Sequence, residues 1–202
     1  GGRRRERQGG GVTAACTAPN SLPANFSTAR CVGGLGWAKP GTSFQVRGAG
    51  GDAGAGQPAA VNFGNLTAGY TFQTFSAQRL FTPLGSPVFD VYFYVPGTQI
   101  PAVVSGFGAV FTDVDQSGTT SAQFFDYAGT SLGVYFAPPL AGGLSFLGAF
   151  TTNGNPAIAR VRITEGNAAM GANDNGTGAD VVVSDDFIDG EPMDTLFPDG
   201  LE

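Results

Sequence analysis

The 202-residue chain has the length of one domain, and 42% of its residues are hydrophobic, which is enough to build a core. Glycine (33) and proline (13) are abundant while lysine occurs once, so the residues that cover exposed helical faces are scarce and an all-α protein is excluded. The absence of histidine excludes Ser-His and Cys-His catalytic pairs and almost every zinc site.

The net charge of −6 is unevenly distributed along the chain. Residues 1–47 are basic and residues 48–202 strongly acidic. The basic run at residues 3–7 (RRRER) lies between glycines, which predicts either a solvated terminus or a first strand that pairs with the acidic body. Nucleic-acid binding is not expected, because the run has no lysine or aromatic neighbour.

Residues 1–60 form an irregular segment rich in turn-forming residues, which packs on the rest of the chain or extends from it. Cys16 and Cys31 lie in this segment, and a disulfide between them would contribute about 3 kcal/mol by loop-closure entropy. Two free thiols are the alternative. The single lysine, the acidic body and a possible disulfide between the two cysteines favour a secreted or cell-surface protein. The sequence contains no run of 18 apolar residues, so it predicts no membrane span.

Residues 61–192 read as a β-sandwich core, followed by a tail at 193–202. Short runs of β-forming residues alternate with turn signals, without helical periodicity between them. Many short strands at this spacing favour an antiparallel sandwich or barrel. The expected strands are at 61–63, 70–75, 88–95, 103–112, 121–126, 131–136, 144–151, 157–164 and 180–188.

Alternation within the strand at 88–95 separates two faces. The core face carries Phe89 and every second residue after it. The opposite face carries Asp90, Tyr92 and Tyr94, a polar and aromatic strip typical of a ligand-binding surface. Ordinary packing under a loop is the alternative for these aromatic side chains.

Asp113, Asp115, Ser117 and Gly118 have the spacing of the first half of a calcium-binding loop, in which alternate oxygen ligands converge on one ion. An EF-hand is excluded, because position 12 of the pattern is Phe124 instead of glutamate. A calcium loop at a strand end and an acidic hairpin turn both remain open.

A second acidic region follows in residues 174–191. A glycine-rich loop with carboxylates at both ends, Asp174 and Asp180, leads into a valine-rich strand that ends in Asp185 and Asp186. Oxygen ligands without histidine or thiolate suit Ca²⁺ better than a transition metal. The alternative is that Asp185 or Asp186 accepts backbone N–H bonds from a neighbouring loop.

Residues 183–188 (VSDDFI) resemble the closing strand of secreted jelly-roll modules, including carbohydrate-binding modules. Residues 106–190 are similar to lectin-like β-sandwich domains of bacterial surface proteins, including those with PEP-CTERM sorting tails. The similar segments are 106–111, 124–133, 146–148 and 159–163. The resemblance implies an antiparallel jelly-roll-like β-sandwich and a structural calcium held by an aspartate of the closing strand. It does not extend to the N-terminal half, where the composition of residues 1–60 predicts an irregular arm.

Catalysis is not expected, although paired carboxylates for glycoside hydrolysis remain available through Glu6, Glu165 and Glu191. We expect a non-enzymatic, calcium-stabilised surface module that binds glycan or another surface ligand. The alternative is a self-assembling surface or filament subunit, a homo-oligomer built by strand pairing between copies.

Overall fold

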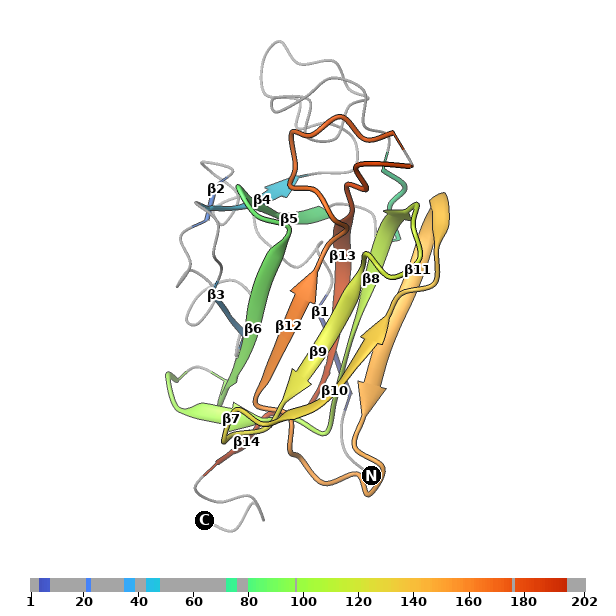
Figure 1. Ribbon diagram of the computed structural model, residues 1–202. Coiled ribbons are helices and arrows are strands. Elements are labelled where there is room, and N and C mark those ends of the chain that lie inside the picture. Colours follow the sequence, from blue (N-terminus) through green and yellow to red (C-terminus); the bar gives the residue numbers. More distant parts are fainter. Residues whose placement is uncertain are drawn as a thin grey trace.

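The computed structural model describes residues 72–75, 80–96, 98–175 and 177–195, and the backbone of four short strands nearer the N-terminus (Figure 1). The strands in chain order are β1 (Arg4–Arg7), β2 (Ser21–Leu22), β3 (Leu35–Ala38), β4 (Ser43–Arg47), β5 (Leu80–Leu84), β6 (Val88–Tyr94), β7 (Pro101–Val103), β8 (Gly106–Val114), β9 (Ser121–Phe125), β10 (Ser131–Phe136), β11 (Leu140–Phe150), β12 (Arg160–Thr164), β13 (Val183–Gly190) and β14 (Met193–Asp194).

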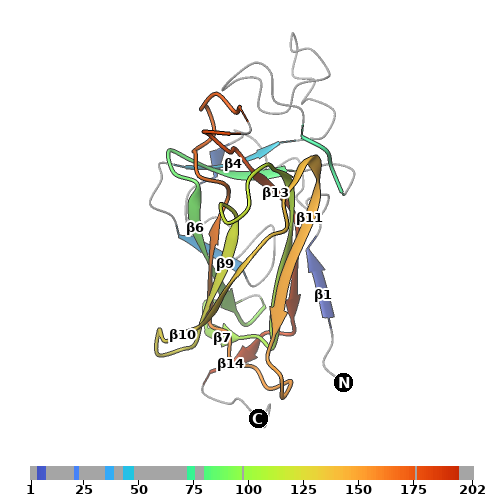
Figure 2. The ribbon, with the colours of Figure 1, turned by 45° about the vertical axis from the view of Figure 1, so that its right-hand side comes forward.

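These strands form two antiparallel sheets that face each other, seen edge-on in Figure 2. One sheet contains β11-β8-β13-β5 and the other β10-β9-β12-β6. The strand pairs are nested around the β9–β10 turn: β9 pairs with β10, β8 with β11, β6 with β12, and β5 with β13. Successive pairs alternate between the sheets, which is the double Greek key of a jelly roll. The all-β, jelly-roll-like sandwich predicted from the sequence is therefore what the chain forms.

Phenylalanine dominates the core between the two sheets. The ring of Phe187 on β13 lies 5.4 Å from that of Phe81, 6.0 Å from that of Phe107 and 6.5 Å from that of Phe89, measured between ring centroids. All four side chains are at most 4% exposed, so strands from both sheets meet at one aromatic cluster. Edge-to-face and tilted pairs of this kind add to the free energy gained by burial.

Most expected strands are present, and the alternation within them is as predicted. Phe89, Val91 and Phe93 of β6 are buried in the core, and Val161 and Ile163 of β12 are fully buried. The expected strand at 103–112 is divided into β7 and β8, because the chain crosses between the sheets at 104–105. β7 pairs with β6 in one sheet and β8 with β13 in the other.

The strand prediction at 70–75 needs correction. Residues 72–75 form no strand, because the backbone N–H of Phe75 donates to a side chain, Asp185 Oδ2 at 2.6 Å, instead of a ladder partner. The structure instead has β5 at Leu80–Leu84, a strand that was not predicted from the sequence. The predicted strand at 61–63 and residues 70–71 lie outside the described residues.

The N-terminal segment supplies strands to both sheets. β1 pairs with the second half of β13, where Arg5 lies opposite Asp189 (Figure 2). The basic run therefore takes the second predicted form, a first strand on the acidic body. β3 pairs with β6, and β4 with β5. Cys16 and Cys31 lie outside the described residues, so their disulfide stays a prediction. Within the described part of the chain, no helix has the length and apolar character to cross a membrane.

Candidate functional site

An acidic cluster lies at one end of the sandwich, where the β8–β9 loop meets the loop before β13 (Figure 1). Carboxylate oxygens of Asp115, Asp174 and Asp180 all lie within 4.8 Å of one another. Asp180 is fully buried, while Asp115 and Asp174 are half-buried. The three carboxylates could hold a metal ion, since hard oxygen ligands at this separation suit a divalent cation.

The side chain of Asp180 fixes the β8–β9 loop. Its Oδ1 accepts the backbone N–H of Asp115 at 3.2 Å and its Oδ2 accepts that of Gln116 at 3.3 Å. The hydroxyl of Thr119 also donates to Oδ2. A buried carboxylate is stabilised when backbone and hydroxyl donors surround it in this way. Asp180 thus joins two loops that are 61 or more residues apart in sequence.

The turn after β12 fixes the backbone of Asp180. Gly166 has a φ of +68°, and a Cβ built there would lie 2.0 Å from the carbonyl oxygen of Asp180. The backbone N–H of Asn167 donates to that carbonyl at 3.0 Å, and the side chain of Asn167 accepts the N–H of Asp180 at 2.8 Å. Only glycine permits this approach, so Gly166 sets the position of the cluster.

Burial and the neighbouring carboxylates raise the affinity of Asp113 and Asp115 for protons. Partial burial, together with the charges of Asp113, Asp174 and Asp180, raises the pKa of Asp115 to about 6. Burial also raises the pKa of Asp113, against the effect of a hydrogen bond from the backbone of Gly142. The four groups therefore carry less than four negative charges near neutral pH, and a divalent cation would remove the repulsion that remains.

Of the other predicted metal ligands, Asp113 lies beside the group of three, with its carboxylate hydrogen-bonded to that of Asp115. Asp113 has a left-handed φ of 67°, and its Oδ1 accepts the N–H of Gly142 at 2.6 Å, which ties the end of β8 to β11. Ser117 is exposed in the turn after Asp115. Asp185 and Asp186 are fully buried in β13, outside the group of three. The hydrogen bond from Phe75 N to Asp185 matches the alternative interpretation of that residue.

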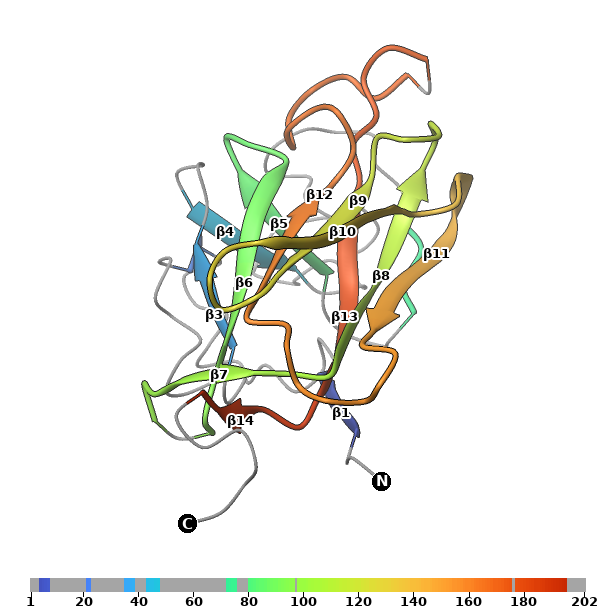
Figure 3. The ribbon, with the colours of Figure 1, turned by 60° about the horizontal axis from the view of Figure 1, so that its bottom comes forward.

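A cleft of about 230 Å³ is lined in part by residues of β7. Figure 3 shows β7 and β14 at the end of the sandwich opposite the acidic cluster. Tyr92 and Tyr94 of β6 line it, as do Tyr127 in the β9–β10 turn and Arg160 at the start of β12. The remaining lining residues are Phe93, Pro101, Ala102, Asp126, Gly129, Ala159 and Thr195. Two of the three residues predicted as ligand-binding are therefore brought to one cleft.

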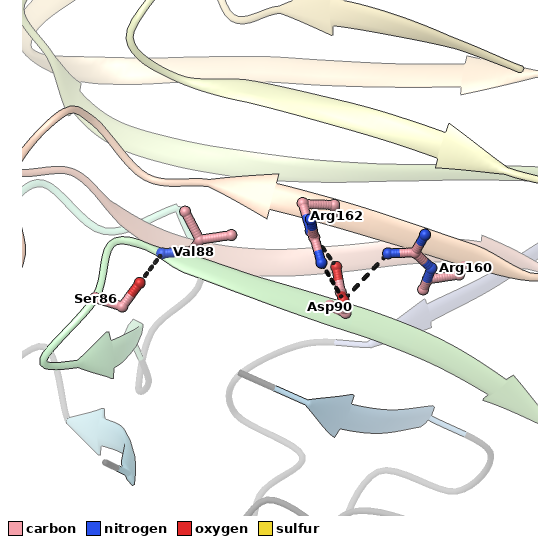
Figure 4. A network of polar contacts seen from close by, with 5 residues as sticks. All are labelled: Ser86, Val88, Asp90, Arg160 and Arg162. Carbon is pink, nitrogen blue, oxygen red and sulfur yellow. Dashed lines mark hydrogen bonds and ion pairs between the residues drawn. The ribbon is translucent and has the colours of Figure 1, made fainter. Parts of the chain in front are cut away.

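Asp90, the third predicted residue, forms ion pairs within the protein instead (Figure 4). Its carboxylate accepts two bonds from Arg162, at 2.8 and 2.9 Å, and one from Arg160 NH1 at 3.1 Å. These bonds raise the pKa of Arg162. Since Asp90 is only 8% exposed and does not line the cleft, its role is to position the two arginines.

Arg160 is held over an aromatic ring as well. Its guanidinium carbon lies 3.7 Å from the centroid of Phe125, a cation–π contact. The antiparallel register places Arg160 opposite both Tyr92 and Phe125. Nη1 of Arg160 donates a hydrogen bond to Asp90, and no other hydrogen bond joins this guanidinium to a described residue. The remaining N–H groups of Arg160 are donors at the cleft.

The β9–β10 turn presents Tyr127 at the rim. Asp126 Oδ1 accepts the N–H of Thr130 at 2.7 Å, and Gly129, with a φ of +82°, donates its N–H to the carbonyl of Asp126. This tight turn leaves Tyr127 72% exposed. Asp126 and Tyr127 of this turn, and Arg160 of β12, were not predicted from the sequence as part of a site.

Of the three candidate catalytic glutamates, Glu165 is fully buried, and it belongs neither to the lining of the cleft nor to the group of three carboxylates. Burial raises its pKa well above the usual value, and the Ser184 hydroxyl donates a hydrogen bond to its Oε1. Glu191 is half-buried just after β13, and nothing is described of the Glu6 side chain.

The comparisons with known proteins assign no family to the chain. No family model matches it, and no curated protein matches it. What stands is an all-β fold of two antiparallel sheets with an acidic cluster at one end and an aromatic cleft at the other.

Proposed function

We propose that the chain is a non-enzymatic module of a secreted or cell-surface protein that binds glycan through the cleft. The single observation that carries this proposal is the meeting of Tyr92, Tyr94 and Tyr127 around one small cavity, with a donor, Arg160, and an acceptor, Asp126, beside them. Aromatic faces pack against sugar C–H groups, and fixed polar side chains select the pattern of hydroxyls.

The protonation states at the cleft suit uncharged hydroxyl ligands. Burial raises the pKa of Tyr94, so its hydroxyl stays protonated at physiological pH and can donate as well as accept. The cation–π contact and the ion pair with Asp90 hold Arg160 before any ligand arrives. A site organised in advance loses less side-chain entropy when it binds.

Calcium at the acidic cluster is the second part of the proposal. Asp115, Asp174 and Asp180 offer only oxygen ligands, and the irregular loops that carry them suit the flexible coordination of Ca²⁺ better than the octahedron of Mg²⁺. The cluster and the cleft lie at opposite ends of the sandwich. The ion therefore has a structural role, holding two loops together, and does not touch the ligand.

Glycan-array binding of the full chain in millimolar CaCl₂ tests the function. We expect binding to a subset of glycans, and its loss when Tyr92 and Tyr94 are both changed to Ala. The matched control is Phe150→Ala, which removes an aromatic side chain that is 79% exposed on the other sheet and should leave binding intact. Absence of binding to every glycan, with calcium present, refutes the proposal.

Self-assembly is a second candidate function, favoured by the exposed apolar edge strand β10. Five of its six residues are exposed, and Leu132, Val134 and Phe136 are each between 44% and 55% exposed. β10 pairs only with β9 among the described strands, so one edge is open to strand addition. Sedimentation of the chain at rising concentration distinguishes the two functions: a monomer throughout removes self-assembly.

A further inference from the structure

The size and charge of the cleft narrow the ligand class, on the basis of the glycan-binding function proposed above. We infer that the cleft takes a single, uncharged sugar ring, such as one neutral hexopyranose, and not an acidic sugar or an extended oligosaccharide chain. The juxtaposition that supports this is a small aromatic cavity with one paired cation, Arg160, and one anion, Asp126.

The size of the cavity sets the length of the ligand. Its volume of about 230 Å³ is below the range of about 300–1,000 Å³ that encloses a drug-sized molecule. Tyr127 in the β9–β10 turn and Pro101 in β7 belong to its lining, so the two segments bound the space. One ring fits such a space, while further sugar units would extend into solvent and add little affinity.

Charge sets the ligand class. Asp90, Arg160 and Arg162 form a connected group with one net positive charge, and Asp126 at the cleft supplies one negative charge. The four charges sum to zero, so the protein offers an anionic ligand no net attraction. An anion would also lose hydration on entering an aromatic cavity, and only the Arg160 N–H groups not bonded to Asp90 would compensate part of that loss. A neutral ring does not carry this cost.

Hydroxyl groups match the polar atoms that remain. Oδ1 of Asp126 is used by the N–H of Thr130, which leaves Oδ2 to accept a hydrogen bond. The Arg160 N–H groups not bonded to Asp90 can donate. An acceptor and a donor fixed at one cavity fit two neighbouring sugar hydroxyls, each of which can donate or accept.

Titration calorimetry of the full chain with neutral monosaccharides, the matching uronic acids and neutral oligosaccharides tests this inference. We expect at least one neutral monosaccharide to bind, its oligosaccharides to bind within about threefold of it, and its uronic acid to bind at least tenfold more weakly. Tyr127→Ala should weaken binding of the neutral sugar about tenfold, as expected for loss of one aromatic contact. Phe150→Ala should leave it unchanged.

Asp126→Asn tests the charge argument without disturbing the turn, because an asparagine oxygen can still accept the N–H of Thr130. This variant should bind the uronic acid about fivefold more tightly than the parent does, the gain expected for removing one charge about 4 Å away in water. Binding of the neutral sugar should change little.

Four results overturn the inference in distinguishable ways. Uronic acids that bind the parent as tightly as neutral sugars refute the charge argument, and oligosaccharides that bind where no monosaccharide competes refute the size argument. Either result leaves the glycan-binding function standing. Binding of no sugar, neutral or acidic, short or long, removes the function itself. Binding of a proline-rich peptide in place of sugars would assign the aromatic cleft to protein recognition.

Discussion

Removal of divalent ions should lower the thermal stability of the protein, because the acidic cluster then repels itself. Asp115, Asp174 and Asp180 form three pairs with oxygens at most 4.8 Å apart. Each ionised pair at that distance repels by about 0.9 kcal/mol in bulk water and about 3.5 kcal/mol at an effective dielectric constant of about 20. The total is several kcal/mol, a large fraction of the stability of an ordinary domain.

The gain from an ion bound only by the folded state is about 2.7 kcal/mol when its concentration is a hundredfold above Kd. For a domain of this size, that corresponds to a Tm increase of about 5–10 °C. The assay is thermal unfolding in EDTA against millimolar CaCl₂. The increase should shrink below pH 6, because the pKa of Asp115 is about 6 and protons then compete with the ion.

Two variants locate the site. Asp174→Asn should abolish the calcium-dependent increase and raise Tm in EDTA, because one charge of the repelling group is gone. Asp185→Asn should lower Tm in both buffers and keep the increase, since Asp185 is buried in β13 outside the cluster and accepts the N–H of Phe75. Equal Tm of the parent in EDTA and in calcium refutes the reasoning. If the calcium-dependent increase in Tm is lost only in Asp185→Asn, the ion is bound at the closing strand β13 instead.

Three further predictions concern single side chains. Gly166→Ala should reduce the free energy of unfolding in urea by at least about 2 kcal/mol, because a Cβ there lies 2.0 Å from the Asp180 carbonyl oxygen. Gly154→Ala, with φ +73° and open space, is its control, and similar losses for both would contradict the role of Gly166. Because burial raises the pKa of Glu165, the parent should lose stability as the pH rises above the value at which the unfolded chain ionises, by up to about 1.4 kcal/mol per pH unit. Glu165→Gln should remove that dependence between pH 5 and 8, and an unchanged slope in urea titrations assigns it to another group. Asp90→Ala should reduce the free energy of unfolding by about 1–2 kcal/mol, since it removes the carboxylate that pairs with Arg160 and Arg162, whose side chains are 20% and 46% exposed. A double-mutant cycle with Arg162→Ala that shows no coupling would contradict this.

Strands in which buried and outward residues alternate strictly could be predicted from the sequence. Strands that form because of contacts between distant segments could not. β6 and β12 alternate between buried and outward residues, so their faces could be read directly. β5 was not predicted from the sequence, and it contains Pro83, a residue uncommon inside strands. Its backbone lies opposite Phe44 of β4 in this sheet, a partner that no local pattern identifies.

The acidic cluster could be predicted only in part, for the same reason. The spacing of Asp113 and Asp115 indicated an ion-binding loop, and the loop ending in Asp174 and Asp180 was recognisable as a separate acidic segment. Their meeting depends on the Thr119 hydroxyl, which donates to Asp180, and on the close approach of Gly166 to the Asp180 carbonyl oxygen. The cleft could not be predicted from local sequence for the same reason, since the register of β12 against β6 and β9 brings Arg160 to Tyr92.

The central position of β13 has a consequence for how the chain reaches its native state. This strand is late in the chain, yet it lies between β8 and β5 and supplies Phe187 to the aromatic cluster. Until residues 183–190 are available, β8 and β5 each have an unpaired edge in the interior of the sheet. Folding is then limited by the closure of long loops, a class of topology that folds in milliseconds to seconds. Chains interrupted before residue 183 would expose both edges together and are expected to aggregate, whereas the intact chain covers them with its last long strand.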